Sequence, residues 1–304
     1  MIRKRTILSL ALLATTAACG GGGGGGAPGP APAVSGGAPA PTASGSTNFN
    51  NPSVMATTDA NGNLTATMAA DATSQTATLT QGDGTADNPT TIHITGPNGI
   101  DHTFNTSANQ LSLEDVTFNG VPIFNTNGSS LAMYSENGGK DVLVSDNSGQ
   151  LSFSNYGVWS HTDSDGHVTV GAFATRNETP VANIPTTGGA TYQGSAVGTG
   201  STGGQAFNLA GSFTGNVDFG ARTAAVNLNM NAIAADGGQT AFNLASGPIS
   251  MTGGRYSGAI AGSGVSGTTA GALYGTAAQE MAGVFSVAGG GTTAIGAYGG
   301  AQQH

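Results

Sequence analysis

The residue with the most clearly predicted chemistry lies near the amino terminus. Cys19 is the only cysteine of the 304 residues, and the small residues Thr16-Ala17-Ala18 come directly before it. A positive segment, Arg3 to Arg5, and a short apolar run, Ile7 to Ala14, precede these in the order of a secretory signal. Small residues before a cysteine are typical of a lipobox. We therefore expect residues 1–18 to be removed and Cys19 to be acylated, which would anchor the chain in the outer membrane of a Gram-negative-type bacterium. The alternative is ordinary secretion with an incidental Cys19.

The segment that follows the anchor predicts a flexible connection. The apolar run before Cys19 is far shorter than the roughly 20 residues of a transmembrane helix. Gly20 to Gly26 are all glycine, and residues 27–46 are Pro, Ala, Gly, Ser and Thr with one Val. Such a composition cannot bury enough apolar surface to offset its chain entropy. We therefore expect residues 19–47 to be a lipid anchor followed by a disordered tether.

Histidines offer the main ligand chemistry in the body of the chain. His93 and His102 flank an Asn98-Gly99 turn, and imidazoles placed across a hairpin could ligate haem iron. The alternative is an exposed cross-strand pair. The run His161 to Gly166 has the look of a calcium loop, but an EF-hand needs an acid first and a glutamate twelfth, where this chain has His161 and Ala172. A tight turn is therefore predicted there, with no metal site.

No motif indicates catalysis. The glycines of Gly198-Thr199-Gly200-Ser201-Thr202-Gly203 match a dinucleotide fingerprint by letter, but no helix follows to offer its amino terminus to a pyrophosphate. The sequence also has no nucleophile elbow, phosphate-binding P-loop or zinc-binding His-Glu-x-x-His. We therefore expect a protein that is not an enzyme and that holds no cofactor.

Charge divides the body into two parts. After Cys19 the chain has four Lys and Arg against sixteen Asp and Glu, which argues against nucleic acid as a partner. Thirteen of these acids lie in residues 47–180 with two bases, whereas residues 181–304 hold three acids and two bases. Pro180 and Pro185 lie at the change. We therefore predict a first domain over residues 48–180 and a second over 181–304. The acidity of the first domain would suit a basic partner or serve solubility alone.

Both parts read as all-β. Asn-Gly and Asp-Gly dipeptides, typical of two-residue hairpins, recur between short runs rich in Thr, Val and aromatic residues. The second part predicts eight strands that can close into an antiparallel barrel. Many interior positions are expected to be Ala or Gly, which would make the core modest. The eight ranges are 190–198, 205–219, 222–232, 239–251, 255–262, 268–274, 281–288 and 292–298.

Several segments carry a family resemblance. The C-terminal part resembles the barrel of the transferrin-binding protein B-like surface lipoproteins, a superfamily that includes factor H binding protein and haem-capturing lipoproteins. Tyr156 to Trp159 and Val170 to Phe173 look like the last strands of the handle domain that precedes this barrel. The segments that carry the barrel resemblance are Thr191 to Gly194, Asp218 to Thr223, Leu273 to Phe285 and Ile295 to Tyr298.

The resemblance implies an antiparallel β handle domain followed by an eight-stranded up-and-down barrel, displayed as a monomer on the outer-membrane surface. It also implies capture of an extracellular partner, either a host protein or a haem-type iron source. Tyr134, Tyr156 and Trp159 are candidate binding anchors or core residues. Two other functions remain open: a structural or adhesive envelope lipoprotein without a soluble ligand, and a small-molecule carrier that uses the barrel mouth.

Overall fold

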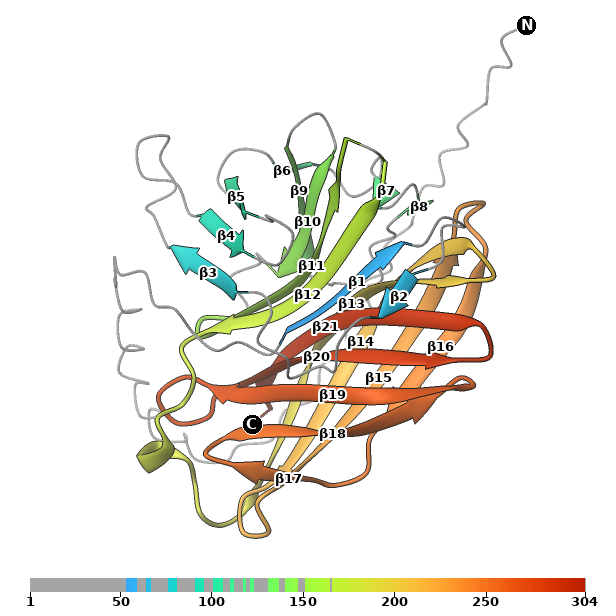
Figure 1. Ribbon diagram of the computed structural model, residues 1–304. Helices are drawn as coiled ribbons and strands as arrows, with labels where there is room; N and C mark the ends of the chain where they lie inside the picture. Colours follow the sequence, from blue (N-terminus) through green and yellow to red (C-terminus); the bar gives the residue numbers. More distant parts are fainter. Residues whose placement is uncertain are drawn as a thin grey trace, which may run out of the picture. The chain divides into compact units, whose positions relative to one another are not determined.

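The computed structural model describes a chain built of β-strands (Figure 1). The residues it describes are 53–58, 64–66, 76–80, 91–95, 101–105, 110–111, 117–118, 121–122, 131–136, 140–146, 151–164 and 166–303. The predicted signal over residues 1–18, Cys19 and the predicted tether over residues 19–47 lie outside this set.

The C-terminal strands form a closed antiparallel barrel, which confirms the predicted architecture. Each strand pairs with its neighbour in sequence, and the last strand returns to the first, with Gly198 opposite Gly296. Two short segments, β16 and β17, both lie between β15 and β18 and together fill one strand position. The barrel therefore has eight strand positions. The strands are β13 (Gly189–Thr202), β14 (Gln205–Asp218), β15 (Thr223–Ala234), β16 (Gln239–Ala245), β17 (Ile249–Thr252), β18 (Arg255–Gly262), β19 (Val265–Tyr274), β20 (Glu280–Gly289) and β21 (Thr292–Gln302).

The fourth barrel position is interrupted where a single strand over residues 239–251 was expected. Ser246-Gly247-Pro248 separates β16 from β17, because Pro248 has no N–H to donate to a ladder. The interruption weakens the join to the next strand. One residue pair links β16 to β18 and two link β17 to β18, whereas eight pairs link β18 to β19.

The barrel interior is filled with large side chains, so the expectation of a modest Ala and Gly core is wrong. Residues of β15 alternate between the two barrel faces, with Val226, Leu228 and Met230 buried inside. Glycines do face the interior, but aromatic rings occupy the space that their side chains would need. A Cβ on Gly200 would lie 2.4 Å from the Phe207 ring, and one on Gly283 would lie 2.6 Å from the Tyr298 hydroxyl.

The preceding strands form three sheets. The largest has the strand order β2-β1-β12-β11-β10-β9-β6, a second has β3-β4-β5, and β7 pairs with β8. We call β1 to β12 the handle. Its strands are β1 (Ser53–Thr58), β2 (Leu64–Ala66), β3 (Thr76–Thr80), β4 (Thr91–Thr95), β5 (Asp101–Asn105), β6 (Gln110–Leu111), β7 (Thr117–Phe118), β8 (Val121–Pro122), β9 (Leu131–Glu136), β10 (Asp141–Asp146), β11 (Ser154–Thr162) and β12 (Val168–Arg176).

The large handle sheet buries a different residue set on each face. On one face Val144, Tyr156 and Val158 pack against outer-face barrel residues, among them Ala282 and Ala297. The small size of those alanines lets the two sheets approach closely. The opposite face carries a second cluster, which includes side chains from β4 and β5. Its members are Ile92, Ile94, Phe104, Tyr134, Leu143, Trp159 and Phe173.

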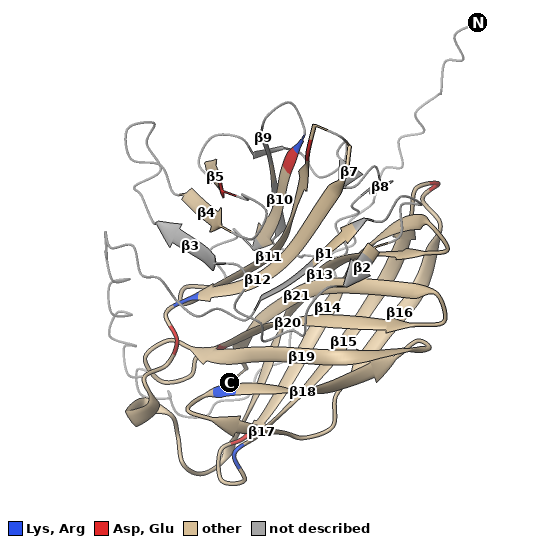
Figure 2. Ribbon diagram, in the orientation of Figure 1, with Lys and Arg blue, Asp and Glu red and all other residues tan. Residues whose placement is uncertain are grey.

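Charged residues are sparse on the barrel (Figure 2). Within the described range 166–303, the charged residues of β13 to β21 are Asp218, Arg255 and Glu280, and each stands at a strand end. Strand interiors can therefore pack on both barrel faces without burying a charge. Among the described residues, the one helix is the three-residue turn Val181–Asn183, and no helix has the length and hydropathy to cross a bilayer.

Candidate functional site

A buried carboxylate joins the handle to the barrel. Glu280, at the start of β20, is 3% exposed. Its two oxygens accept hydrogen bonds from the backbone N–H groups of Ser152, Phe153 and Ser154, at 2.6 to 3.2 Å, and from the Ser154 hydroxyl at 2.8 Å. Ser154 is the first residue of β11, and Ser152 and Phe153 come directly before it. One side chain of the barrel therefore satisfies three consecutive donors of the handle.

The turn that precedes Glu280 needs particular residues at two positions. Gly275 has a φ of +96°, and a Cβ there would lie 2.3 Å from the Gln279 side-chain oxygen. Ala278 is also left-handed, with a φ of +59°, and its carbonyl accepts a 2.7 Å hydrogen bond from the buried Tyr192 hydroxyl. The turn is thus fastened to the barrel interior on one side while Glu280 holds the handle on the other.

Burial at this junction shifts the pKa values of two charged side chains. Burial raises the pKa of the Glu280 carboxyl above its ordinary value, and the hydrogen bonds from Ser154, Ser152 and Phe153 oppose that rise. Burial also lowers the pKa of the nearby Arg176 guanidinium, an effect that the negative charge of Glu280 opposes. At the rim, Arg255 donates to Glu178 with an Nε–Oε2 distance of 2.8 Å.

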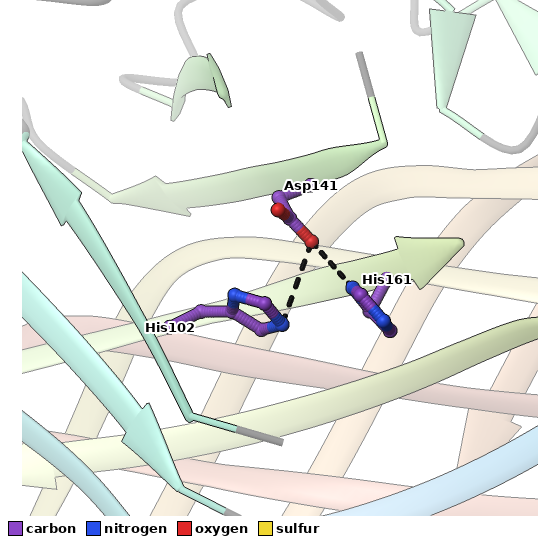
Figure 3. Close-up of polar contacts among 3 residues, drawn as sticks. All are labelled: His102, Asp141 and His161. Atoms are coloured by element: carbon purple, nitrogen blue, oxygen red, sulfur yellow. Dashed lines mark hydrogen bonds and ion pairs between the residues drawn. The ribbon is translucent and has the colours of Figure 1, made fainter. Parts of the chain in front are cut away.

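A second polar group lies in the handle, where His102, Asp141 and His161 converge (Figure 3). The His161 Nδ1 atom is 2.6 Å from the Asp141 Oδ1 atom, and the His102 Nε2 atom is 3.6 Å from the same oxygen. The two imidazole centroids are 4.6 Å apart, and the ring planes differ by 31°. All three potential ligand atoms lie within 4.8 Å of one another.

Strand register brings these three side chains together. Asp141 on β10 is directly opposite His161 on β11, one position beyond the pair Val142 and Ser160. His102 comes from β5, in the separate β3-β4-β5 sheet. The apolar cluster around Trp159 holds this sheet against β10 and β11. The polar group thus stands where two sheets meet at the edge of a dry core.

The predicted pairing of His93 with His102 is wrong. His93 lies opposite Thr103 and His102 lies opposite Ile94, so the two imidazoles point to opposite faces of the hairpin. His93 contacts Asp101 instead, with an Nε2–Oδ1 distance of 2.7 Å at the exposed surface. One haem iron cannot be ligated by both residues in this arrangement.

The other sequence candidates have structural positions. Tyr134, Tyr156 and Trp159 are each 1% exposed or less and belong to the core. Gly198 and Gly200 of the dinucleotide-like run lie within β13, and Gly203 lies in the turn that follows. The described part of the calcium-like run forms a turn, in which the Asp163 carboxylate accepts a 2.9 Å hydrogen bond from the His167 N–H.

Asp141 and its partnership with two histidines are not evident in the sequence alone. The three residues are separated by 39 and 20 positions and come from two sheets. The available signal is the alternation of Asp141-Val142-Leu143 and Trp159-Ser160-His161, which places a polar residue beside a large apolar one on the same face of each strand. Locating His102 beside them needs the tertiary packing.

The two barrel ends differ. One end opens into a depression of about 530 Å³, and the rings of Phe207 and Phe242 in its wall have centroids 5.9 Å apart. At the other end, Ile184 of the segment between the handle and β13 packs against the barrel core. A smaller depression of about 90 Å³ lies at this second end, between Ile184, Phe219 and Met251.

Comparison with known proteins finds one family model that matches the barrel. Residues 184–302 match the model of the C-lobe and N-lobe beta barrels of Tf-binding protein B. The C-terminal domain of this chain is therefore a transferrin-binding protein B-like barrel. No curated protein sequence matches the chain significantly.

Solved structures of similar proteins include a haemoglobin receptor, a transferrin-binding protein and a lactoferrin-binding protein. The haemoglobin receptor of Kingella denitrificans, solved with human haemoglobin, is 13% identical, with 85% of this chain and 89% of the receptor covered and a TM-score of 0.45. Transferrin-binding protein B of Neisseria meningitidis is 15% identical, with 76% and 50% covered and a TM-score of 0.41. The N-lobe of lactoferrin-binding protein B of Moraxella bovis is 14% identical, with 58% and 80% covered and a TM-score of 0.37. The chain spans about half the length of the transferrin-binding protein B structures that it matches.

Proposed function

We propose that this chain is a non-enzymatic surface lipoprotein that binds an extracellular host protein. The observation that carries the proposal is the match of residues 184–302 to the barrel domain of transferrin-binding protein B. Proteins with this architecture are described as receptors or binding proteins for transferrin, lactoferrin and haemoglobin. The apolar face and the Glu280 hydrogen bonds that hold the handle to the barrel support a single preformed binding platform.

A binding experiment tests the partner. A chain of residues 40–304, which contains every described strand, can be immobilised through an added tag. Human transferrin, lactoferrin and haemoglobin, and then whole serum, are passed over the surface, with the heat-denatured chain as control. Saturable binding of one protein is expected. If no protein is enriched over the denatured chain, the proposal is wrong.

Attachment through Cys19 is the second part of the proposal. Its support is the cysteine after Thr16-Ala17-Ala18, preceded by a secretory signal. In cells that make the full chain, Cys19→Ser is expected to abolish fatty-acid labelling and to remove the protein from the outer-membrane fraction. Protease treatment of intact cells then tests whether the anchored protein faces outward. Labelling that persists in Cys19→Ser would contradict the anchor.

Haem is a narrower version of the same function, since the partner could be a haem-type iron source. Adding hemin to the chain would give the Soret band of ligated haem if a histidine coordinates the iron. An unchanged spectrum of free hemin would remove the haem version and leave the protein-binding proposal in place.

A further inference from the structure

We propose that His102, Asp141 and His161 form a binding site for one divalent transition-metal ion, with Zn²⁺ as its natural probe. Two imidazoles and a carboxylate are donors that Zn²⁺ and its neighbours in the first transition series accept. This site is independent of the protein-binding function proposed above, since it rests on geometry within the handle alone.

The distances are close to those that a bound ion requires. Ligand atoms at about 2.0–2.1 Å from a tetrahedral ion are roughly 3.3 Å from one another. The distances from Asp141 Oδ1 to the two imidazole nitrogens are 2.6 and 3.6 Å, which lie on either side of that value. The third distance, between the two imidazole nitrogens, is bounded at 4.8 Å, so the histidine side chains would move together on binding. The ion would replace the hydrogen bond between His161 and Asp141 by two metal–ligand bonds.

Burial divides the three ligands into an anchor and two accessible partners. The Asp141 side chain is 2% exposed, whereas the His102 and His161 side chains are 21% and 27% exposed. The histidines line an open depression of about 470 Å³ that also contains Lys140, Asp163 and Ser164. An ion can therefore enter from solvent, and water can occupy the coordination positions that the protein leaves open.

The charges around the depression favour a cation. Asp141 and Asp163 line it with one opposing charge, Lys140. The first domain as a whole carries thirteen acids against two bases, and such an excess raises the local concentration of cations.

Bound metal would also connect two sheets. His102 stands on the small β3-β4-β5 sheet, while Asp141 and His161 stand on the large handle sheet. An ion held by all three would join sheets that otherwise meet through side-chain packing around Trp159. A ligand that binds the native state alone raises its stability, so Zn²⁺ should raise the melting temperature of the handle.

His93 provides a matched control. It also contacts a carboxylate, Asp101, at 2.7 Å, but it is more exposed, and no second histidine joins it among the residues that the structure describes. A variant at His93 removes one imidazole from the same hairpin without touching the proposed site. Cys19→Ser serves as the background, because it removes the one thiol of the chain, which would compete for Zn²⁺.

The experiment uses the full-length Cys19→Ser chain without an affinity tag, stripped with a chelator. Zn²⁺ affinity is measured by competition with a chromophoric indicator, and Co²⁺ supplies a spectrum that reports the donor set. We expect one equivalent to bind, His102→Ala and His161→Ala each to weaken binding at least tenfold, and His93→Ala to leave it unchanged. Zn²⁺ should raise the melting temperature, read from Trp159 fluorescence, in the background and His93→Ala chains but not in His102→Ala.

Two results would overturn the site. One is the absence of stoichiometric Zn²⁺ binding in the background chain, which would leave the group as a hydrogen-bonded His–Asp pair with a stacked histidine. The other is equal loss of affinity in His93→Ala and His102→Ala, which would indicate nonspecific surface binding. Neither result bears on serum-protein binding by residues 40–304, so the two proposals fail separately.

Discussion

At the scale of single residues, Glu280 offers the sharpest test. Glu280→Gln replaces one acceptor oxygen by an NH₂ group that would face N–H donors from residues 152–154. Leaving buried donors unsatisfied costs about 1–3 kcal/mol in the free energy of unfolding. The matched control is Glu178→Gln, whose partly exposed ion pair with Arg255 should be worth less than about 1 kcal/mol. Denaturant titration of both variants distinguishes them, and equal losses would contradict the role given to Glu280.

The raised pKa of Glu280 also predicts a pH dependence. Between the ordinary value of 4.5 and the higher folded value, the native state binds more protons than the unfolded chain. The stabilisation from protonating Glu280 is thus present below about pH 4.5 and is lost as the pH rises through the folded pKa. The stability difference between wild type and Glu280→Gln should therefore narrow from pH 4.5 toward pH 7. A difference that widens over this range would show that the pKa is not raised.

Replacing either of two buried tyrosines by phenylalanine should change the stability of the protein in opposite ways. The Tyr298 hydroxyl lies 2.6 Å from the Thr269 hydroxyl and 3.0 Å from that of Tyr256, inside the barrel. The buried Tyr274 hydroxyl has no hydrogen-bond partner among the described residues. Tyr298→Phe should cost about 1–3 kcal/mol because it leaves polar atoms buried without partners, whereas Tyr274→Phe should be neutral or stabilising. Thermal unfolding of both variants checks this order.

Residue types alone predicted part of the candidate chemistry. The sequence indicated that imidazoles were the ligands to examine, and it placed His93 and His102 on one hairpin. It paired the wrong two because a one-residue shift in register moves a side chain to the opposite face. The register of β4 and β5 puts His102 on the inner face, toward β11. Which face His102 occupies depends on which face of the hairpin is buried. The sequence around Asp141 does not indicate that it contacts His102.

At the scale of elements, a glycine opposite the single tryptophan is the critical position of the handle sheet. Gly171 on β12 is paired with Trp159 on β11, and a Cβ there would lie 2.3 to 2.6 Å from the indole. Gly171→Ala should therefore displace Trp159 and cost about 1–3 kcal/mol through overpacking. Gly247→Ala is the control, since nothing lies within 4 Å of its Cβ position. Trp159 fluorescence reports the change directly, and an unshifted spectrum with unchanged stability would contradict it.

The barrel strands could be predicted closely because their alternation and turns are local. Val226, Leu228 and Met230 alternate with asparagines, and Gly203-Gly204 and Gly290-Gly291 supply left-handed turn residues. The large side chains of the barrel interior were not predicted, because a glycine in one strand suggests that the space beside it is empty. Its neighbouring strand supplies the ring that fills the space, as Phe207 does at Gly200. Packing across strands is not visible along one strand.

At the scale of the whole molecule, handle and barrel should unfold together. Ala297 is fully buried beneath the handle sheet. Ala297→Glu would place an uncompensated charge there, which is tolerated only if the sheets separate. In wild type we expect one denaturant transition by Trp159 fluorescence and far-ultraviolet circular dichroism. In Ala297→Glu the fluorescence transition should come first. Asn229→Glu, on the exposed outer face of β15, should keep the two transitions together.

The docking of the two parts was not predictable from either part alone. Alanines were expected in the barrel interior, whereas Ala282 and Ala297 line the outer face beneath the handle. A small residue in a sequence indicates that another segment packs closely against it, but it does not identify that segment. The carboxylate of Glu280 meets donors more than 120 positions earlier in the chain. Neither periodicity nor composition carries information over that separation.

The barrel should open locally at one preferred place. This place is the interrupted pairing of β18 with β16 and β17. A ring of strands opens where fewest pairs hold it, and three pairs hold this seam against eight on the other side of β18. Opening there would turn the ring into a ribbon with two free edges while the other ladders stay intact. Amide protons of β16 should then exchange with deuterated water sooner than those of β20 and β21. At high protein concentration, the same free edges would allow two molecules to exchange a strand.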